Sequence, residues 1–225
     1  MTFTRRTVPI SAALLVGFLS ASAVAQTAAP HPPRQTQSDD YTRYELLDPS
    51  SASFRILYEV TATTPGARSF WNPIRKGSIA SDESVTDPAS GRPLKFAEVS
   101  GAEARAGGLP DADLDTRYLQ IELPRPVPAQ GEVRLLIDKT YKDAKSYFVE
   151  PETGFIVFSR SLGIKRNAVV LPVGYDVVFC SYPSQVIPEP ASMATGEPRS
   201  ARLVLSFFNI GPDAVSYLVK ARRTK

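Results

Sequence analysis

The stretch FRILYEV, residues 54–60, decides the expected fold, because Phe54, Ile56, Tyr58 and Val60 stand at every second position. Successive side chains of a β-strand point to opposite faces, so these four side chains share one face. The stretch YLQIEL, residues 118–123, repeats the alternation, with apolar side chains on one face and polar ones on the other. Both stretches therefore predict strands of which one face is buried.

Strand-like runs follow one another along the chain, separated by turn signals rich in Pro, Gly and Asp. The chain has 20 Pro in 225 residues, nearly twice the usual share of about 5%, and almost all lie between the runs. Such runs without amphipathic helices predict an all-β protein, an immunoglobulin-like antiparallel β-sandwich of about 9–11 short strands with little helix. The expected strands are Tyr41–Leu47, Ser53–Thr63, Ile74–Ser81, Leu94–Ser100, Arg117–Leu123, Glu132–Tyr141, Phe155–Ser159, Ala168–Leu171, Tyr175–Ser181, Arg202–Phe208 and Ala214–Ala221.

Residues 1–25 have the pattern of a cleaved secretory signal peptide. Arg5 and Arg6 precede an apolar run, Ile10–Leu19, and Ala23-Val24-Ala25 supplies small residues before Gln26. A positive segment, a short apolar segment and an A-x-A site are features of exported chains. The apolar run is about half of the ~20 residues that cross a bilayer, so we expect no retained transmembrane helix. The mature protein is expected to be periplasmic or extracellular.

Residues 26–40 are polar and Pro-rich without apolar periodicity, which predicts a disordered tether. Residues 41–225 are expected to form the β-sandwich domain, which is long enough for one sizeable core. One domain is favoured over two, because no linker-like stretch interrupts the middle, and the candidate sub-boundary is residues 150–154. The Ile187–Ser200 stretch predicts a long surface loop.

The charge balance depends on the signal peptide. The whole chain carries 26 Lys and Arg against 23 Asp and Glu, and residues 1–25 contain two of the cations and no acid. The mature chain is therefore close to neutral and lacks the positive field that attracts nucleic acid. We expect no nucleic-acid partner.

The middle of the chain resembles the N-terminal β-sandwich domain of the M1-type zinc aminopeptidases. The resemblance is carried by LQIELPRPVPAQG, residues 119–131, by the alternating strand VRLLIDKTY, residues 133–141, and by a later echo, VLPVGYDVV, residues 170–178. In that family a strand that ends in a Pro-rich turn and a Gly leads into such an amphipathic strand. The resemblance implies the architecture of that domain and not peptidase activity, because this sequence contains neither the zinc motif H-E-x-x-H nor the catalytic domain.

Imidazole and thiol groups are scarce. His31 is the only histidine and lies in the expected tether, and Cys180 is the only cysteine. We therefore expect no Ser-His-Asp or Cys-His arrangement, no zinc site and no intramolecular disulfide. Because Cys180 follows the apolar residues VVF, a buried and inert thiol is expected, with a disulfide to another chain as the alternative.

Asp111, Asp113 and Asp115 alternate in LPDADLD, residues 109–115, and Glu122 stands at the twelfth position counted from Asp111. A calcium loop uses this spacing, because Ca²⁺ takes several carboxylate oxygens around one turn. The sixth position, however, is Thr116 instead of Gly, and Glu122 falls in an expected strand. We expect a solvated acidic turn and no cofactor, with calcium at the three Asp residues as the alternative.

Two pairs of residues have the types that hydrolysis needs. Ser161 and Lys165 could suggest a Ser–Lys dyad, but a chance pairing is favoured. Glu150 and Glu152 could serve as a glycosidase carboxylate pair, but they flank Pro151 in an expected turn. No catalytic residue is assigned.

The remaining candidates are basic and aromatic. Arg160, Lys165 and Arg166 are expected to form a basic loop. Trp71, the only tryptophan, could stack on a sugar if it were exposed, but a place at the edge of the core is favoured.

These observations favour an exported binding or interaction module of the cell envelope, whose partner is an envelope protein or a glycan. One alternative is a carboxylate-based hydrolase or carbohydrate-active enzyme. The other is a carbohydrate-binding module centred on Trp71.

Overall fold

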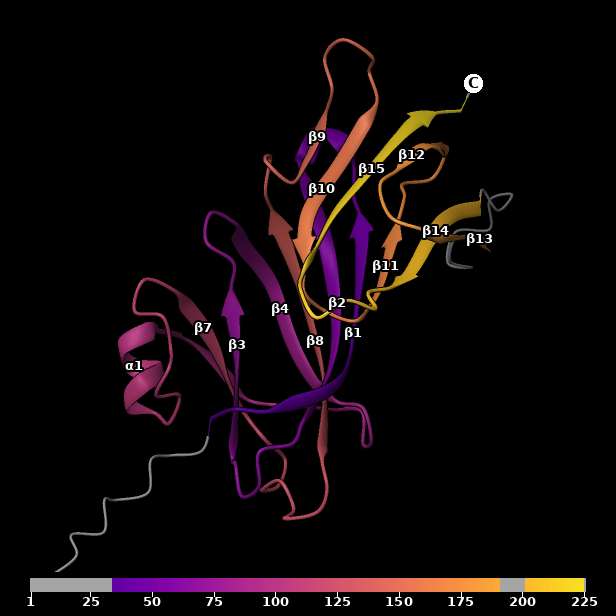
Figure 1. Ribbon diagram of the computed structural model, residues 1–225. Coiled ribbons are helices and arrows are strands. Elements are labelled where there is room, and N and C mark those ends of the chain that lie inside the picture. Colours follow the sequence, from indigo (N-terminus) through magenta and orange to yellow (C-terminus); the bar gives the residue numbers. More distant parts are fainter. Residues whose placement is uncertain (1–33, 191–200, 225) are drawn as a thin grey trace, which may run out of the picture. The chain divides into compact units, whose positions relative to one another are not determined.

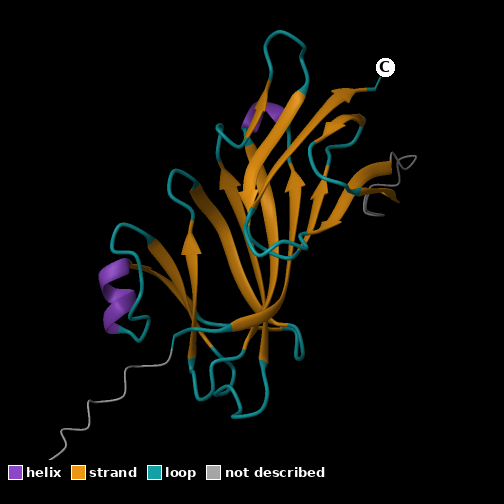
Figure 2. Ribbon diagram, in the orientation of Figure 1, coloured by secondary structure: helices purple, strands orange, loops and turns teal. Residues whose placement is uncertain are grey.

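The computed structural model describes residues 34–190 and 201–224, so the expected signal peptide, residues 26–33 of the tether and His31 lie outside the described residues. The described chain is mostly β-strand, in three sheets (Figures 1 and 2). Its helices are the short α1 (Gly101–Ala106) and the 3-10 turn η1 (Pro49–Ser51). The expected all-β class with little helix is confirmed.

The largest sheet has eight strands, and the two smaller sheets have four and three. In order of pairing, the large sheet contains β13 (Gln185–Pro190), β14 (Ala201–Phe208), β11 (Arg166–Val170), β1 (Gln37–Leu46), β2 (Ser53–Ala62), β8 (Val133–Lys142), β4 (Ile79–Asp87) and β5 (Arg92–Pro93). The four-stranded sheet contains β12 (Tyr175–Cys180), β15 (Val215–Arg223), β10 (Ile156–Leu162) and β9 (Tyr147–Val149). The three-stranded sheet contains β3 (Ser69–Ile74), β7 (Arg117–Glu122) and β6 (Phe96–Ser100).

The pairs of the large sheet are antiparallel except for one parallel pair, which the sequence did not predict. Strands β1 and β11 pair in parallel, with Tyr41 opposite Arg166 and Glu45 opposite Val170. A parallel pair needs a long connection, and here all the strands from β2 to β10 lie between the two partners in sequence. The described strands also exceed the expected number, and their arrangement in three sheets differs from the two sheets of an immunoglobulin domain.

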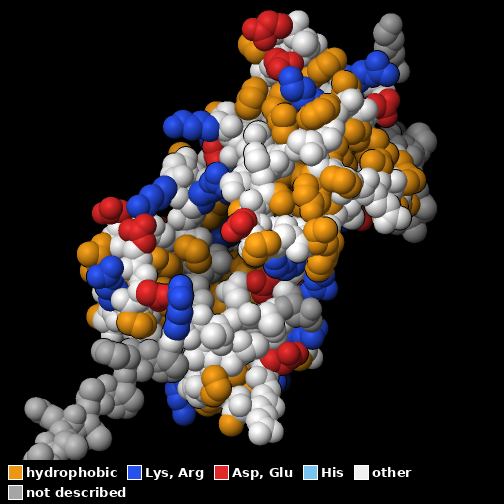
Figure 3. Space-filling view, viewed as in Figure 1, with side chains coloured by type: hydrophobic (Ala, Val, Ile, Leu, Met, Phe, Trp, Pro, Cys, Tyr) orange, Lys and Arg blue, Asp and Glu red, His pale blue; other side chains and the backbone are white. Residues whose placement is uncertain are grey.

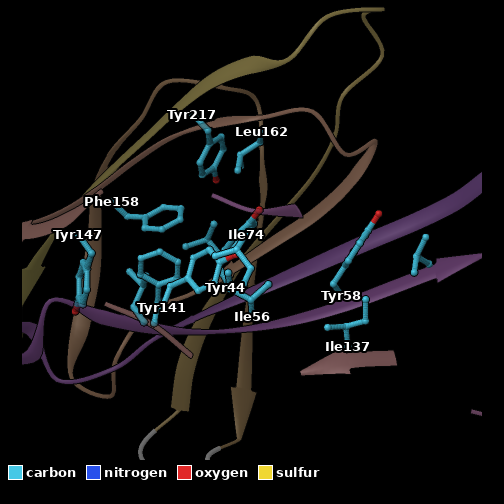
Figure 4. Close-up of a cluster of buried hydrophobic side chains, with 14 of the residues drawn as sticks. Tyr44, Ile56, Tyr58, Ile74, Ile137, Tyr141, Tyr147, Phe158, Leu162 and Tyr217 are labelled. Atoms are coloured by element: carbon cyan, nitrogen blue, oxygen red, sulfur yellow. The ribbon is translucent and has the colours of Figure 1, made fainter. Parts of the chain in front are cut away.

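The sandwich character is confirmed by the core, which is shared by all three sheets. Phe54 of the large sheet, Ile121 of the three-stranded sheet and Phe158 of the four-stranded sheet are all within one buried cluster. The rings of Phe54 and Phe158 meet edge to face with their centroids 5.4 Å apart. Figure 4 shows part of this cluster, with Phe158 and Tyr217 facing the side chains of the large sheet. Both small sheets therefore pack against the same face of the large sheet.

The expected strand Ile74–Ser81 was wrong, because a turn divides it. Strand β3 ends at Ile74, Ser78 N donates to Arg75 O (3.1 Å), and β4 begins at Ile79. Gly77 has φ +83°, in the left-handed region that a glycine adopts without strain. The apolar residues at the two ends of the run belong to different sheets.

Two segments expected to lack regular structure contain strands. The Ile187–Ser200 loop is wrong in its first part, where β13 pairs with β14 as the edge strand of the large sheet and so tolerates its two Pro. Residues 191–200 lie outside the described residues. Strand β1 begins at Gln37, within the expected tether, and Gln35 pairs with the main chain of Trp71 through two hydrogen bonds of 2.8 and 3.0 Å.

The candidate sub-boundary, residues 150–154, is the turn between β9 and β10. Gly154 N donates to Glu150 O over 2.8 Å, and Gly154 has φ +69°. The described residues all belong to one compact unit, Pro32–Lys225. Neither helix in the described ranges has the length and apolar character required to cross a membrane.

Candidate anion-binding site

A pocket of about 180 Å³ lies over the inner face of the large sheet, between the two small sheets. Strands β1, β2 and β8 of the large sheet contribute its floor, β3 and β10 contribute its sides, and the segment after β10 contributes Ile164. Figure 4 labels four of the floor residues, Tyr44, Ile56, Tyr58 and Tyr141. The lining residues are Thr42, Tyr44, Ile56, Tyr58, Asn72, Pro73, Arg75, Lys139, Tyr141, Arg160 and Ile164.

Lys139 occupies a position where the sheet pattern calls for an apolar side chain. It lies opposite Ile56 on β2, which lies opposite Tyr44 on β1, so the three side chains form one row on the inner face. Lys139 is only 4% exposed, and its Nζ donates to Asn72 Oδ1 over 2.5 Å. Burial lowers the pKa of Lys139 to about 8, although the charge of Glu83 opposes the shift. The ammonium group is therefore held inside the core, and no carboxylate of the described residues is hydrogen-bonded to it.

Arg160 enters the same pocket from β10 and is 6% exposed. Its guanidinium carbon lies 5.0 Å from the centroid of the Phe54 ring, 5.7 Å from that of Tyr141 and 5.8 Å from that of Tyr44. Three aromatic rings thus surround the cation, an arrangement that stabilises a desolvated guanidinium. Burial lowers the pKa of Arg160, which nevertheless stays protonated at physiological pH.

One edge of the Arg160 guanidinium is engaged and another is free. Its Nη1 lies 3.4 Å from Asp143 Oδ2 and 3.5 Å from Ser146 Oγ. Its Nε is buried and has no hydrogen-bond partner in residues 34–190 and 201–224. A buried donor without a partner costs free energy, so the polar groups of Arg160 are only partly compensated by the described residues.

Asp143 lies behind Arg160 and is 8% exposed. It accepts hydrogen bonds from Ser146 Oγ (2.7 Å) and from the backbone N–H groups of Ser146 and Lys145 (3.1 Å each). Burial would raise the pKa of Asp143, but these hydrogen bonds and Arg160 together lower it. Asp143 therefore stays ionised and holds Nη1 of Arg160 in place, without itself lining the pocket.

A third cation and the hydroxyl groups of three tyrosines add to the polar lining. Arg75 is exposed, its Nη1 lies 3.5 Å from Ser161 O, and its backbone N–H donates to the hydroxyl of Tyr141 over 3.3 Å. Burial raises the pKa of Tyr44, Tyr58 and Tyr141, so these phenols stay neutral and can donate hydrogen bonds. The described lining has three cations and no Asp or Glu, so it favours an anion.

Sequence reasoning missed both buried cations, although a signal exists for each. Lys139 continues the inward series Val133, Leu135 and Ile137 on β8, and Arg160 continues the inward series of β10. A cation at an inward position of an apolar strand marks a buried polar site. The expected basic loop of Arg160, Lys165 and Arg166 is therefore wrong for Arg160, which is buried in β10.

The three Asp residues of the possible calcium loop lie between α1 and β7, and each lies beside a basic side chain. Lys76 Nζ lies 3.0 Å from Asp113 Oδ2 and 3.9 Å from Asp115 Oδ2, and Arg34 Nε lies 2.9 Å from Asp111 Oδ2. Glu122 is the last residue of β7. Within the described ranges, no three His, Cys, Asp or Glu side chains are grouped as metal ligands.

The residues of the two possible hydrolytic pairs do not face each other. Lys165 Nζ donates to Gly211 O, and Ser161 lies on the exposed face of β10. Glu150 accepts hydrogen bonds from Lys220 Nζ and Thr153 Oγ1, each over 2.6 Å. None of these side chains lines the pocket.

Trp71 is buried, with 4% exposure, which removes the basis for sugar stacking on its ring. It packs with Tyr118, Ala104, Leu109 and Ala112 between the three-stranded sheet and α1. The favoured place at the edge of the core is therefore confirmed for the ring, and a carbohydrate-binding module centred on it is not supported.

Cys180 is half-buried instead of buried, which corrects the expectation for its thiol. Its Sγ lies 3.1 Å from Tyr182 O and 3.4 Å from the hydroxyl of Tyr217. The preceding Val178 and Phe179 are 46% and 48% exposed, because a bulge interrupts the pairing of β12 with β15. An apolar run thus marked an edge strand and not a buried one.

Comparison with known proteins gives structural matches alone. No family model matches the chain, and no curated protein matches it. Solved structures of an M1 zinc metallopeptidase from Deinococcus radiodurans, and of a mutant of it bound to a Tyr-Ser-Ala substrate, are similar with a TM-score of 0.49 and 10% identity. The match covers 84% of this chain and 42% of those chains, so the chain spans less than half of their length. These structures belong to the family that the sequence resembles.

Proposed function

We propose that the chain is an exported binding module of the cell envelope and that its ligand is a compact anion held between Lys139 and Arg160. The observation that carries the proposal is the burial of two cations, 4% and 6% exposed, in one pocket whose described lining contains no acid. Burying a charge costs free energy unless a partner compensates it. A bound anion would supply that compensation to Lys139 and would accept from Nε of Arg160.

The groups around the pocket are donors, as an anion-binding site requires. Lys139 and Arg160 give charge-assisted hydrogen bonds, and the tyrosine hydroxyls add neutral ones. Lys139 and Arg160 are themselves buried, which strengthens their electrostatic contacts. These features support binding, and they need no movement of the sheet.

Isothermal titration calorimetry with inorganic phosphate, sulfate and acetate at pH 7 and low salt tests the proposal. We expect at least one of these anions to bind the wild type, and Lys139→Met to weaken that binding at least tenfold. Lys142→Met is the matched control, because Lys142 lies on the same strand and is exposed. The proposal fails if none of the anions binds a folded wild type, or if the two variants bind equally well.

Export is tested separately by N-terminal sequencing of the protein recovered from a bacterial host. We expect the mature chain to begin at Gln26 and the variant Ala25→Phe to remain uncleaved, because the cleavage site requires small residues. Ala28→Phe lies beyond the site and should be cleaved normally. Recovery of the wild type with Met1 in place would overturn the proposal that the chain is exported through this segment.

A second candidate function, binding to an envelope protein, is favoured by apolar side chains at one end of the sandwich. Phe179, Ile187 and Phe208 are 48%, 41% and 55% exposed. Figure 3 shows hydrophobic side chains gathered over β12 and the β13–β14 pair. Groups of exposed apolar residues mark protein contacts more often than chance.

Cross-linking in the envelope fraction tests this second function. We expect the double variant Phe179→Ser and Ile187→Ser to lose a cross-linked partner band that the wild type gives. Phe96→Ser, which removes a 37% exposed ring from another sheet, should retain the band. The same pattern of bands for all three proteins would refute the role of this surface.

A further inference from the structure

The pocket joins a cationic end to apolar walls, and this combination narrows the class of anion. Ile56 and Ile164 line it together with Pro73, beside the rings of Tyr44 and Tyr141. The tetrahedral oxyanions phosphate and sulfate present oxygen on every side, so in this pocket some of their oxygens would face hydrocarbon. A molecule with one anionic end and an apolar body would match both kinds of wall.

The donors lie where a carboxylate could use them. Arg160 lines the pocket, its Nη1 faces Asp143, and its Nε is buried without a hydrogen-bond partner in the described residues. The planar guanidinium presents its edge to planar anions, and carboxylate is the group that matches this edge best. Lys139 adds a point charge, and Asn72 holds that ammonium at 2.5 Å.

The volume of the pocket favours a small ligand. A volume of about 180 Å³ corresponds to about six water molecules at ~30 Å³ each. A carboxylate with a chain of three to five carbons has about five to seven non-hydrogen atoms, which is the same scale. Drug-sized or nucleotide ligands need larger pockets.

We propose that the occupant is a short-chain aliphatic monocarboxylate, bound with its carboxylate toward Arg160 and Lys139 and its chain against Ile56 and Ile164. This inference rests on the proposed anion-binding function and specifies its ligand class. Ile164 is the specificity-determining residue, because it is half-buried, packs on the core and comes from a loop outside the sheets. Its side chain sets how long a chain the pocket accepts.

Calorimetry with acetate, butyrate, butyramide and inorganic phosphate tests the ligand class. We expect butyrate to bind more tightly than acetate by roughly fourfold per added methylene. Butyramide, which has the same shape without the charge, should not bind. If phosphate binds and butyrate does not, the anion site stands and this inference is refuted; if no anion binds, both proposals fail. Equal binding of butyramide and butyrate would also refute the inference.

A change at Ile164 tests chain-length selection. We expect Ile164→Ala to bind hexanoate more tightly than the wild type does, by about tenfold, and to bind acetate unchanged. Ile187→Ala is the matched control, because Ile187 is 41% exposed on β13 and does not line the pocket. Melting curves establish that both variants are folded. The comparison of acids on the wild-type protein tests the ligand class even if a variant does not fold. If Ile164→Ala binds hexanoate and acetate with the same relative affinity as the wild type, Ile164 does not select the chain length.

Discussion

Lys139 shows what a single inward cation does to a strand of otherwise apolar side chains. Its neighbours Ile137 and Tyr141 on the same face of β8 are buried at 0% and 2% exposure. The ammonium has one amide partner and lies 5.0 Å from the centroid of the Tyr141 ring. The free energy of desolvation is therefore only partly offset, and the fold is less stable than it would be with an apolar residue.

The first prediction follows from the pKa of Lys139, which burial lowers from 10.5 to about 8. Below about pH 8 the amine is charged in both the folded and the unfolded protein, so the full free-energy cost of burying the charge is present. As the pH rises from about 8 to 10.5, the unfolded protein binds more protons than the folded one, and this cost disappears. Lys139→Met should stabilise the fold at pH 7 by on the order of 3 kcal/mol, and by less at pH 10. Urea unfolding at both pH values measures this.

Lys142→Met is the control for this prediction, because its ammonium group is exposed on the same strand. We expect its free energy of unfolding to follow that of the wild type at both pH values. A Lys139→Met variant less stable than the wild type at pH 7 would mean that the ammonium is fully compensated inside the protein. That result would also contradict the proposal that Lys139 needs a bound anion as its partner.

The second prediction concerns Asp143, whose carboxylate accepts hydrogen bonds from Ser78, Lys145 and Ser146 and faces Arg160. Asp143→Asn should lower the free energy of unfolding by about 2–4 kcal/mol, because it leaves the buried guanidinium without its countercharge. Since the pKa of Asp143 is lowered in the folded state, its contribution is present above the unfolded pKa, near 4, and is lost as the pH falls through the folded pKa. The difference between the variant and the wild type should thus narrow in acid.

Denaturation in guanidinium chloride at pH 7 and pH 3 measures the effect of Asp143→Asn. Asp176→Asn, at an exposed position of β12, is the control and should change stability by less than ~0.5 kcal/mol. A difference of similar size at both pH values would contradict the assignment of an ionised carboxylate.

At the scale of elements, the start of α1 packs closely against the backbone of the segment that connects α1 to β7, residues 107–116. Gly101 is buried, and a Cβ placed there would lie 2.1 Å from Asp113 O and 2.7 Å from Leu114 Cα. Neither contact can be relieved by rotating a side chain, because both involve backbone atoms. Gly101→Ala should therefore lower the stability of the fold by about 1–3 kcal/mol.

Thermal unfolding followed by far-ultraviolet circular dichroism measures the third prediction. Gly163→Ala is the matched control, because a Cβ there would meet only the Cβ of Ala214, at 3.9 Å. We expect a lower melting temperature for Gly101→Ala and an unchanged one for Gly163→Ala. Equal melting temperatures would show that α1 moves away without affecting the sandwich.

The elements that alternation predicts are those with one face in the core, such as β2, β7 and β8. Edge strand β13 was missed because its side chains are mostly exposed and its two Pro are typical of a loop. The β1–β11 pair could not be predicted from local pattern, because its two strands lie far apart in the sequence, with β2 to β10 between them. The candidate pocket could not be predicted either, because its residues come from β1, β3, β8 and β10, which are distant in sequence.

At the scale of the whole molecule, the question is whether the three sheets behave as one cooperative unit. Strand β3 links two cores, because Phe70 and Ile74 belong to the cluster shared by all sheets and Trp71 belongs to the cluster beneath α1. Gln35, which precedes β1, also holds the backbone of Trp71. Strand β3 and the hydrogen bonds of Gln35 therefore connect α1 and the residues packed beneath it to the sandwich.

The fourth prediction is a single unfolding transition. Trp71 is the only tryptophan, so its fluorescence reports on the α1 region, while far-ultraviolet circular dichroism reports on all the strands. Coincident transitions are the test of two-state behaviour, and we expect the two midpoints in urea to agree within experimental error. Gly101→Ala should shift both midpoints together. A fluorescence transition at lower urea than the circular dichroism transition would show instead that β3, β7 and α1 unfold first, and it would divide the expected single domain into two cooperative units.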